Sequence, residues 1–185
     1  MKTIICIIGT IGSGKDTAAE YISRKLDIPT FQMSQVLKDF AKEQGIEPTR
    51  DNLIKIGSAL VKENGPGFVV KTLADRTSED LIIITGVRRT EVIEYMHENY
   101  NIILLSINAP AAVRFQRCVA RNKLGEAKTL TEFIKNEKKE NSPPNTERLF
   151  ECMKLADYTI TNDADLETFF QKIDELLKIK ELEKK

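Results

Sequence analysis

The chain has 185 residues, with 28 lysines and arginines balanced by 28 aspartates and glutamates. Its length suits a single domain over residues 1–185, and its zero net charge argues against nucleic acid as the principal partner. Three scattered cysteines exclude a disulfide framework, and no apolar run approaches the ~20 residues of a membrane span. The first strand begins at the N-terminus without a leader, so we expect a cytoplasmic protein with no membrane partner.

The first element is an apolar run, Thr3–Ile8, which predicts a buried strand that leads into a glycine-rich segment. Residues 9–17 read Gly-Thr-Ile-Gly-Ser-Gly-Lys-Asp-Thr, and helix-forming residues follow. In this context the backbone amides and the helix N-terminus bind phosphate oxygens, and Lys15 contacts the phosphoryl group in transfer. The residues that we expect to bind a nucleotide here are Gly9, Gly12, Ser13, Gly14, Lys15, Asp16 and Thr17.

Strand-like and helix-like segments alternate along the rest of the chain, which predicts a parallel sheet with helices on both faces. The further strands are expected at Pro29–Met33, Leu81–Thr85, Ile102–Ile107 and Tyr158–Thr161. A last helix is predicted by apolar residues at helical spacing, which are Leu166, Phe169, Phe170, Ile173, Leu176 and Leu177. The fold class is therefore α/β, with three layers (α/β/α) and a five-stranded parallel sheet.

Two stretches interrupt the alternation. Residues 34–79 carry helical patterns without a strand, with breaks at 45–48 and 64–67. Residues 122–145 are polar, and Thr129-Leu130-Thr131-Glu132 within them predicts a helix that starts with a capping box. We expect the first stretch to hold a phosphoryl acceptor and the second to be a lid that closes over the donor and excludes water.

A basic helix precedes the expected lid. Arg114, Arg117 and Arg121 are spaced to share one helix face, and residues 111–140 hold eight basic side chains against four acidic ones. A solvated surface is the common role of such a face. After a phosphate-binding loop, however, a local positive excess suits contact with polyphosphate, so we expect Arg117 and Arg121 to be catalytic.

The strand at Leu81–Thr85 ends in Thr85-Gly86-Val87-Arg88-Arg89. In phosphate-loop enzymes this strand end commonly supplies an aspartate to the magnesium shell, but here the residue is Thr85. We hypothesise that Asp16 and Thr85 together hold a hydrated Mg²⁺, although Asp16 could instead cap its helix. Arg88 follows the carboxyl end of the strand, where α/β proteins bind ligands, and is predicted to be catalytic and to contact the substrate phosphate. Arg89 is expected on the surface.

Two cations in the first helical stretch are further candidates for acceptor binding. Arg50 opens a helical pattern and could bind a substrate phosphate, with a solvated face as the alternative. Lys38 is a second candidate for the same role.

The loop at 9–17 and the segment 83–91, Ile-Ile-Thr-Gly-Val-Arg-Arg-Thr-Glu, resemble deoxynucleoside monophosphate kinases, although those have an aspartate in place of Gly86. Arg114, Arg117, Arg121 and residues 156–162, Ala-Asp-Tyr-Thr-Ile-Thr-Asn, are similar to dephospho-coenzyme A kinase and to a largely archaeal adenylate-kinase-related family. Over essentially its whole length the chain thus resembles the P-loop nucleotide-kinase superfamily. The resemblance implies a P-loop NTPase fold of the nucleoside monophosphate kinase type, with ATP and Mg²⁺ as cofactors. It also implies that lid arginines contact the donor and that the loop starting at Asn162 borders adenine.

One departure from dephospho-coenzyme A kinase concerns the acceptor. That family has an aspartate just after the second strand, whereas Phe31-Gln32-Met33-Ser34-Gln35 here contains no carboxylate before Asp39. A hydroxyl acceptor benefits from a general base, but a phosphate acceptor is already ionised near neutral pH.

The sequence therefore favours a kinase that phosphorylates a small phosphorylated acceptor, a nucleoside or deoxynucleoside monophosphate first of all. The alternatives are a kinase that phosphorylates a hydroxyl and an ATPase switch that acts on a macromolecular partner. The chain is expected to be a monomer or a homodimer.

Overall fold

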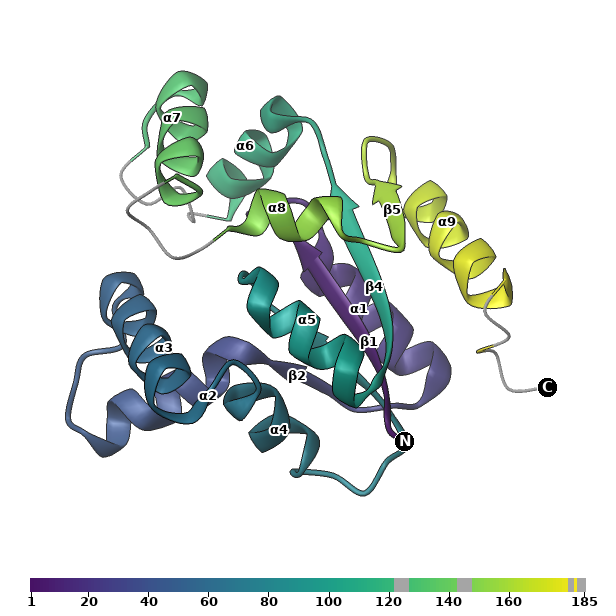
Figure 1. Ribbon diagram of the computed structural model, residues 1–185. Coiled ribbons are helices and arrows are strands. Elements are labelled where there is room, and N and C mark those ends of the chain that lie inside the picture. Colours follow the sequence, from purple (N-terminus) through teal and green to yellow (C-terminus); the bar gives the residue numbers. More distant parts are fainter. Residues whose placement is uncertain (122–126, 143–147, 180–181, 183–185) are drawn as a thin grey trace.

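The computed structural model describes residues 1–121, 127–142, 148–179 and 182 (Figure 1). Its sheet has five parallel strands in the order β2-β3-β1-β4-β5. The strands are β1 Thr3–Gly9, β2 Thr30–Gln32, β3 Leu81–Thr85, β4 Asn101–Asn108 and β5 Tyr158–Thr161. This sheet confirms the predicted fold class and, within two residues at each end, the predicted strands.

The helices between the strands include the expected run without a strand, which comprises α2, α3 and α4. In chain order the helices are α1 Lys15–Leu26, α2 Met33–Glu43, α3 Arg50–Asn64, α4 Phe68–Ala74, α5 Thr90–Asn99, α6 Ala111–Ala120, α7 Leu130–Glu140, α8 Leu149–Lys154 and α9 Leu166–Ile179. The capping box that begins α7 is formed as predicted, since the Thr129 and Glu132 side chains each accept a backbone N–H of the other residue. The structure does not describe residues 122–126 and 143–147, where parts of the predicted lid lie.

Alternating residues of the central strand β1 enter two different cores, as a strand with helices on both faces requires. Ile4, Cys6 and Ile8 pack with buried side chains from α2, α3, α4, α5 and α8. Ile5 and Ile7 pack with α1 and α9 on the opposite face. Because all five strands are parallel, their carboxyl ends meet at one edge of the sheet, and this edge carries the glycine-rich loop.

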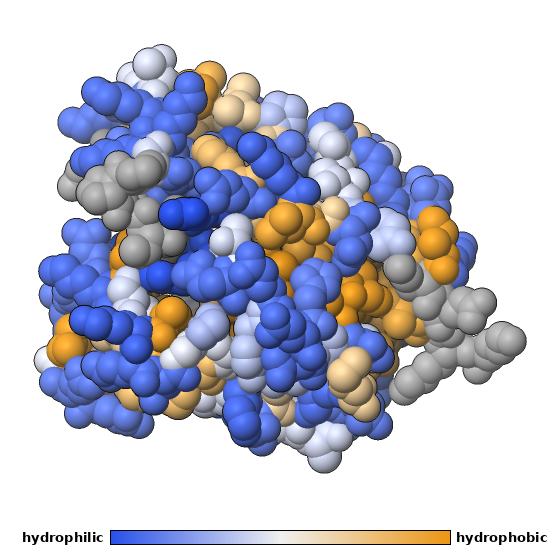
Figure 2. All heavy atoms as spheres, in the orientation of Figure 1, coloured by the Kyte–Doolittle hydropathy of each residue, from blue (hydrophilic) through white to orange (hydrophobic). Residues whose placement is uncertain are grey.

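The face of the molecule in Figure 2 is mostly hydrophilic, with hydrophobic residues gathered near its centre. Among the described residues, the exposed large apolar side chains include Phe150 of α8 and Leu155 just after it. Among the described residues, no helix is both long enough and apolar enough to cross a membrane.

Candidate nucleotide and acceptor site

The loop between β1 and α1 is built for close backbone approach. Gly12 and Gly14 have φ values of +76° and +100°, a region that side-chain-bearing residues rarely adopt. A Cβ on Gly14 would lie 2.3 Å from Nδ2 of Asn162, and one on Gly12 would lie 2.7 Å from the carbonyl oxygen of Arg114. The glycine pattern therefore fixes the loop against two other elements as well as shaping it.

The first turn of α1 presents both charges of the loop. Gly14 is the N-cap and no side chain caps the helix, so Asp16 does not play the capping role. Instead, Nζ of Lys15 lies 2.9 Å from each carboxylate oxygen of Asp16. Both side chains are accessible, at 20% and 54% exposure, so Lys15 can exchange this partner for a phosphate. The free amides of a helix N-terminus add a favourable field for an anion.

A cavity of about 210 Å³ opens beside this loop. Its described lining comes from the loop and α1, from the end of α6, and from the segment after β5. These residues are Gly12, Gly14, Thr17, Arg117, Arg121, Asn162, Ala164 and Leu166. The structure thus brings together six of the residues predicted for nucleotide binding and catalysis, at the place where the resemblance puts the donor.

Asn162 connects the loop to the arginines. Its Nδ2 donates to the carbonyl oxygen of Ser13 at 2.8 Å, and its Oδ1 accepts from Nη2 of Arg117 at 3.1 Å. Burial, and then the nearby Arg121 cation, lower the pKa of Arg117 from its ordinary value. Two guanidinium groups held at close quarters are stabilised by an anion between them, as a polyphosphate would provide.

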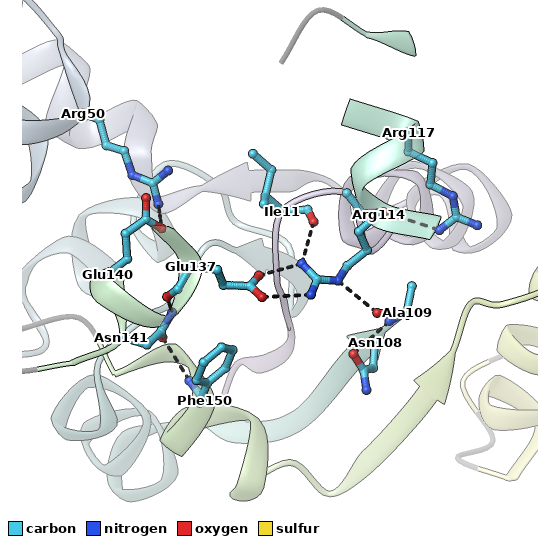
Figure 3. A network of polar contacts seen from close by, with 11 residues as sticks. Ile11, Arg50, Asn108, Ala109, Arg114, Arg117, Glu137, Glu140, Asn141 and Phe150 are labelled. Atoms are coloured by element: carbon cyan, nitrogen blue, oxygen red, sulfur yellow. Dashed lines mark hydrogen bonds and ion pairs between the residues drawn. The ribbon is translucent and has the colours of Figure 1, made fainter. Parts of the chain in front are cut away.

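Arg114 has a different role from Arg117 on the same helix and from Arg121 at its C-cap. It is buried, and its guanidinium pairs with both carboxylate oxygens of Glu137 on α7, at 2.6 and 2.8 Å (Figure 3). It also donates to the carbonyl oxygens of Ile11 in the loop and Ala109 before α6. Arg114, which the resemblance groups with the donor-contacting arginines, is therefore a positioning residue that joins the loop to α6 and α7.

A second cavity, of about 200 Å³, lies between α2, α3 and the segment after β3. Arg50 and Arg88, the two arginines that the sequence proposes for acceptor binding, both line it. Arg89 lines it too, with a side chain only 13% exposed and with Nη2 donating to Ser58 Oγ at 2.7 Å. The expectation that Arg89 is a surface residue was wrong, because its partner comes from a helix distant in the sequence.

The structure does not bring Lys38 to this cavity. Lys38 lines a separate depression with Asp39, Lys42 and the turn after α2. Asp39, the first carboxylate after β2, is occupied there by Arg76 and Gln35, and the hydrogen bond from Arg76 leads in lowering its pKa. Neither residue is placed to act on a molecule in the cavity with Arg50.

Arg50 also connects the two helical stretches. Its Nη2 lies 2.7 Å from Oε2 of Glu140 at the end of α7 (Figure 3). This ion pair joins the helix that opens the acceptor stretch to the described helix of the predicted lid. The sequence offered no signal for it, since the two residues are 90 positions apart.

The residues proposed for Mg²⁺, Asp16 and Thr85, offer one carboxylate and one hydroxyl from the first turn of α1 and the end of β3. Among the described residues no group of three or more His, Cys, Asp or Glu side chains could hold a metal by itself. Thr85 is buried at the end of β3. It pairs there with Ile7 of β1, and Ile7 lies two residues before Gly9, the first residue of the glycine-rich loop. One carboxylate, one hydroxyl and substrate phosphates are the sparse ligand set that Mg²⁺ accepts in kinases.

The motif at residues 156–162 also has a structural role. Oδ2 of Asp157 accepts the backbone N–H of Leu104 at 2.7 Å, one residue before β5 starts to pair with β4 at Leu105. This bond sets where β5 begins and so where Asn162 emerges at the loop.

A glycine-rich loop after the first strand, on a sheet of this order, defines a P-loop NTPase with a kinase-like fold. A family model described as an AAA domain matches residues 5–141. A UPF0200 protein of Pyrococcus horikoshii is 32% identical over 182 residues, which cover 94% of this chain and 95% of that protein. A UPF0200/UPF0201 protein of Archaeoglobus fulgidus is 29% identical over 181 residues, 94% of this chain and 54% of that longer relative. The chain belongs to the AAA domain family that this model describes and to the UPF0200 family.

Solved structures with the same fold include several kinases. Shikimate kinase from Bacteroides thetaiotaomicron superposes with a TM-score of 0.57 at 17% identity, over 97% of this chain and 98% of that one. The protein TT1252 from Thermus thermophilus gives a TM-score of 0.62 at 20% identity, over 96% and 97% of the two chains. At these identities the likeness establishes the fold and leaves the substrate open.

Proposed function

We propose that this chain is an ATP-dependent kinase that transfers the γ-phosphoryl group of Mg·ATP to a small phosphorylated acceptor. One observation carries the proposal: two cavities open beside the carboxyl ends of the strands, one at the glycine-rich loop and one lined by Arg50, Arg88 and Arg89. Among the described residues, the lining of the second cavity has three cations and no carboxylate. Such a lining suits an acceptor that brings its own negative charge.

In this mechanism the protein orients two anions and neutralises their charge. The loop amides cradle the β-phosphate of the donor, and Lys15 leaves Asp16 for the γ-phosphoryl group. Arg117 and Arg121 stabilise the charge that spreads over the transferring group. Asp16 and Thr85 would hold Mg²⁺, and the ion would supply neutralisation of the donor's phosphate charge.

Arg50 and Arg88 hold the acceptor phosphate in line with the donor. The bond from the γ-phosphorus to the oxygen that bridges it to the β-phosphate breaks, and an oxygen of the acceptor phosphate bonds to the same phosphorus. The products are ADP and a phosphoric anhydride. An acceptor phosphate has a second pKa of ~6, so it needs no general base at neutral pH. This agrees with the position of Asp39 outside the cavity.

The resemblance places nucleoside and deoxynucleoside monophosphates first among the acceptors to be tested. We further propose that residues 34–79 are the acceptor-binding part and 122–145 the lid. The test is ADP release from Mg·ATP with each nucleoside and deoxynucleoside monophosphate, dephospho-coenzyme A and phosphomevalonate, with Lys15→Ala as the control. Stimulation that depends on Lys15 would establish a small-molecule kinase. Slow hydrolysis that no acceptor stimulates would overturn the proposal and favour an ATPase switch.

A further inference from the structure

The acceptor cavity has a two-part lining. One part is three arginines, and Arg50 among them already holds an anion, the carboxylate of Glu140 at 2.7 Å. The rest of the described lining is mostly aliphatic and comes mainly from α2, α3, α4 and α5. Six of its members are Leu37, Leu53, Ile54, Val61, Val69 and Val92.

The polar groups that read a nucleobase are missing from this described lining. It contains no aromatic ring on which a base could stack, and no Asn, Gln, Asp or Glu side chain to pair with a base edge. Ser34 is its only uncharged polar side chain among the described residues. Proteins that recognise bases use stacking together with hydrogen bonds to the base edges, and an aliphatic wall leaves those edges without partners.

The acceptor cavity, at about 200 Å³, is close in volume to the cavity of about 210 Å³ beside the glycine-rich loop, so its lining rather than its volume distinguishes the acceptor. Gly57 of α3 faces Leu37 of α2, where an added Cβ would meet Leu37 Cδ1 at 3.5 Å, an ordinary van der Waals contact, so the two helices approach closely on this side.

We infer that the acceptor is a short aliphatic monophosphate ester, whose chain packs on the α2–α3 wall and whose phosphate meets Arg50, Arg88 and Arg89. The inference rests on the proposed kinase function and narrows its acceptor, away from the nucleotides that the resemblance favours. The product is the matching alkyl diphosphate, formed when an oxygen of the acceptor phosphate takes the γ-phosphoryl group and ADP leaves. Each added methylene that the wall covers strengthens binding until the chain outgrows the cavity.

The experiment compares ADP release from Mg·ATP with propyl, pentyl, isopentyl and octyl phosphate, with AMP, CMP, GMP, UMP and dTMP, and with isopentanol. The diphosphate product is confirmed by mass spectrometry, and Lys15→Ala gives the background. The expected result is a higher kcat/KM for pentyl or isopentyl phosphate than for any nucleotide, with propyl phosphate weaker by about tenfold for the two lost methylenes.

Variants of the wall provide the matched test. Val61→Thr replaces one wall methyl by a hydroxyl of similar volume, and Leu53→Asn replaces a branched alkyl group by a carboxamide of similar shape. Both should raise the KM for pentyl phosphate, by about tenfold for Leu53→Asn, and leave the KM for ATP unchanged. Leu155→Asn, at a position 47% exposed after α8, is the control and should change neither constant.

The outcomes separate the two proposals. A nucleotide with the highest kcat/KM would overturn the aliphatic acceptor and leave the kinase function standing. Faster transfer to isopentanol than to its phosphate, or no transfer that depends on Lys15, would overturn both. An unchanged KM for pentyl phosphate in both wall variants would show that the chain of the acceptor lies elsewhere and would also overturn the inference.

Discussion

Arg114 on α6 and Glu137 on α7 form a bidentate ion pair, with Nη1–Oε1 and Nη2–Oε2 distances of 2.6 and 2.8 Å. The two side chains are only 7% and 11% exposed. Because the same guanidinium donates to the carbonyl oxygen of Ile11, the pair also supports the glycine-rich loop. Arg114 lies 5.5 Å from the ring centre of Phe133, which packs among the apolar residues between α6 and α7. One buried cation thus links the donor loop to the described helix of the predicted lid.

Removing the acidic partner should therefore affect stability and donor binding together. We expect Glu137→Gln to lower the free energy of unfolding by about 3 kcal/mol, because it leaves Arg114 buried without a counter-charge. ATP should also bind more weakly, since the loop loses an anchor. Urea unfolding and ATP titration measure the two effects.

The matched control is Glu140→Gln on the same helix. Its pair with Arg50 is more exposed, at 33% and 47%, so its loss should cost less than about 1 kcal/mol. Equal losses of stability in the two variants would contradict the role given to Arg114.

Gly14→Ala should abolish ATP binding in a chain that still folds. The new Cβ would sit 2.3 Å from Nδ2 of Asn162 at a φ of +100°, so either the loop or the Asn162–Arg117 contact must move. Gly45→Ala separates strain from contact, because Gly45 has a φ of +66° and nothing lies within 4 Å of its Cβ position. That control should cost about 1 kcal/mol of stability, because a Cβ is strained in the left-handed region, and should leave ATP affinity unchanged. Calorimetric titration with ATP that finds the two variants alike would show that the contact with Asn162 does not matter.

The strands and the donor loop were predictable because their signals are local. Apolar runs such as Leu81–Thr85 mark strands buried on both faces, and the capping box at Thr129 is written in four consecutive residues. The glycine pattern at 9–17 likewise indicates its own geometry. Each of these features is signalled by residues that are neighbours in the sequence.

The partners of the arginines were not predictable, because they lie far away in the sequence. Helical spacing grouped Arg114 with Arg121. In the structure α6 ends at Ala120, so Arg121 is the C-cap, whereas Arg114 lies in the first half of the helix and its side chain is buried. Its partner Glu137 is 23 residues away, and Ser58, which holds Arg89, is 31 residues away. A periodic pattern shows which side chains share a face, and only the packing of helices decides what that face meets.

Asp16→Asn tests the metal role of the carboxylate beside Lys15. If Asp16 holds Mg²⁺, the Mg²⁺ concentration for half-maximal turnover should rise about tenfold, a loss of about 1.4 kcal/mol in metal binding. Asp27→Asn, at the left-handed C-cap of the same helix, is the control, since asparagine tolerates that φ of 54°. An unchanged Mg²⁺ requirement in Asp16→Asn would mean that the residue serves only as the resting partner of Lys15.

Ser58→Ala should weaken binding of the acceptor and leave binding of ATP unchanged. Ser58 accepts a hydrogen bond of 2.7 Å from Arg89 and itself donates to the carbonyl oxygen of Ile54, so it fixes the arginine against α3. Its loss should raise the KM for the acceptor about tenfold, because a hydrogen bond to a charged group usually contributes about that much to binding. The kcat and the KM for ATP should change little. Ser142→Ala, which removes an exposed hydroxyl bonded to the carbonyl oxygen of Lys138, is the matched control. A rise in the KM for ATP instead would place Arg89 on the donor side.

Asp39→Asn separates a structural carboxylate from a catalytic base. The hydrogen bonds from Arg76 and then Gln35 lower the pKa of Asp39 in the folded protein, so the ionised form stabilises the fold above the unfolded pKa of about 3.9. The wild type should therefore exceed the variant in unfolding free energy at pH 7, and the difference should shrink as the pH falls through the lowered pKa. Urea unfolding across this range measures it. The kcat at pH 7 should not change, because Asp39 faces the depression with Lys38 and lies outside the acceptor cavity. A large loss of kcat would identify Asp39 as a general base and favour a hydroxyl acceptor over a phosphate.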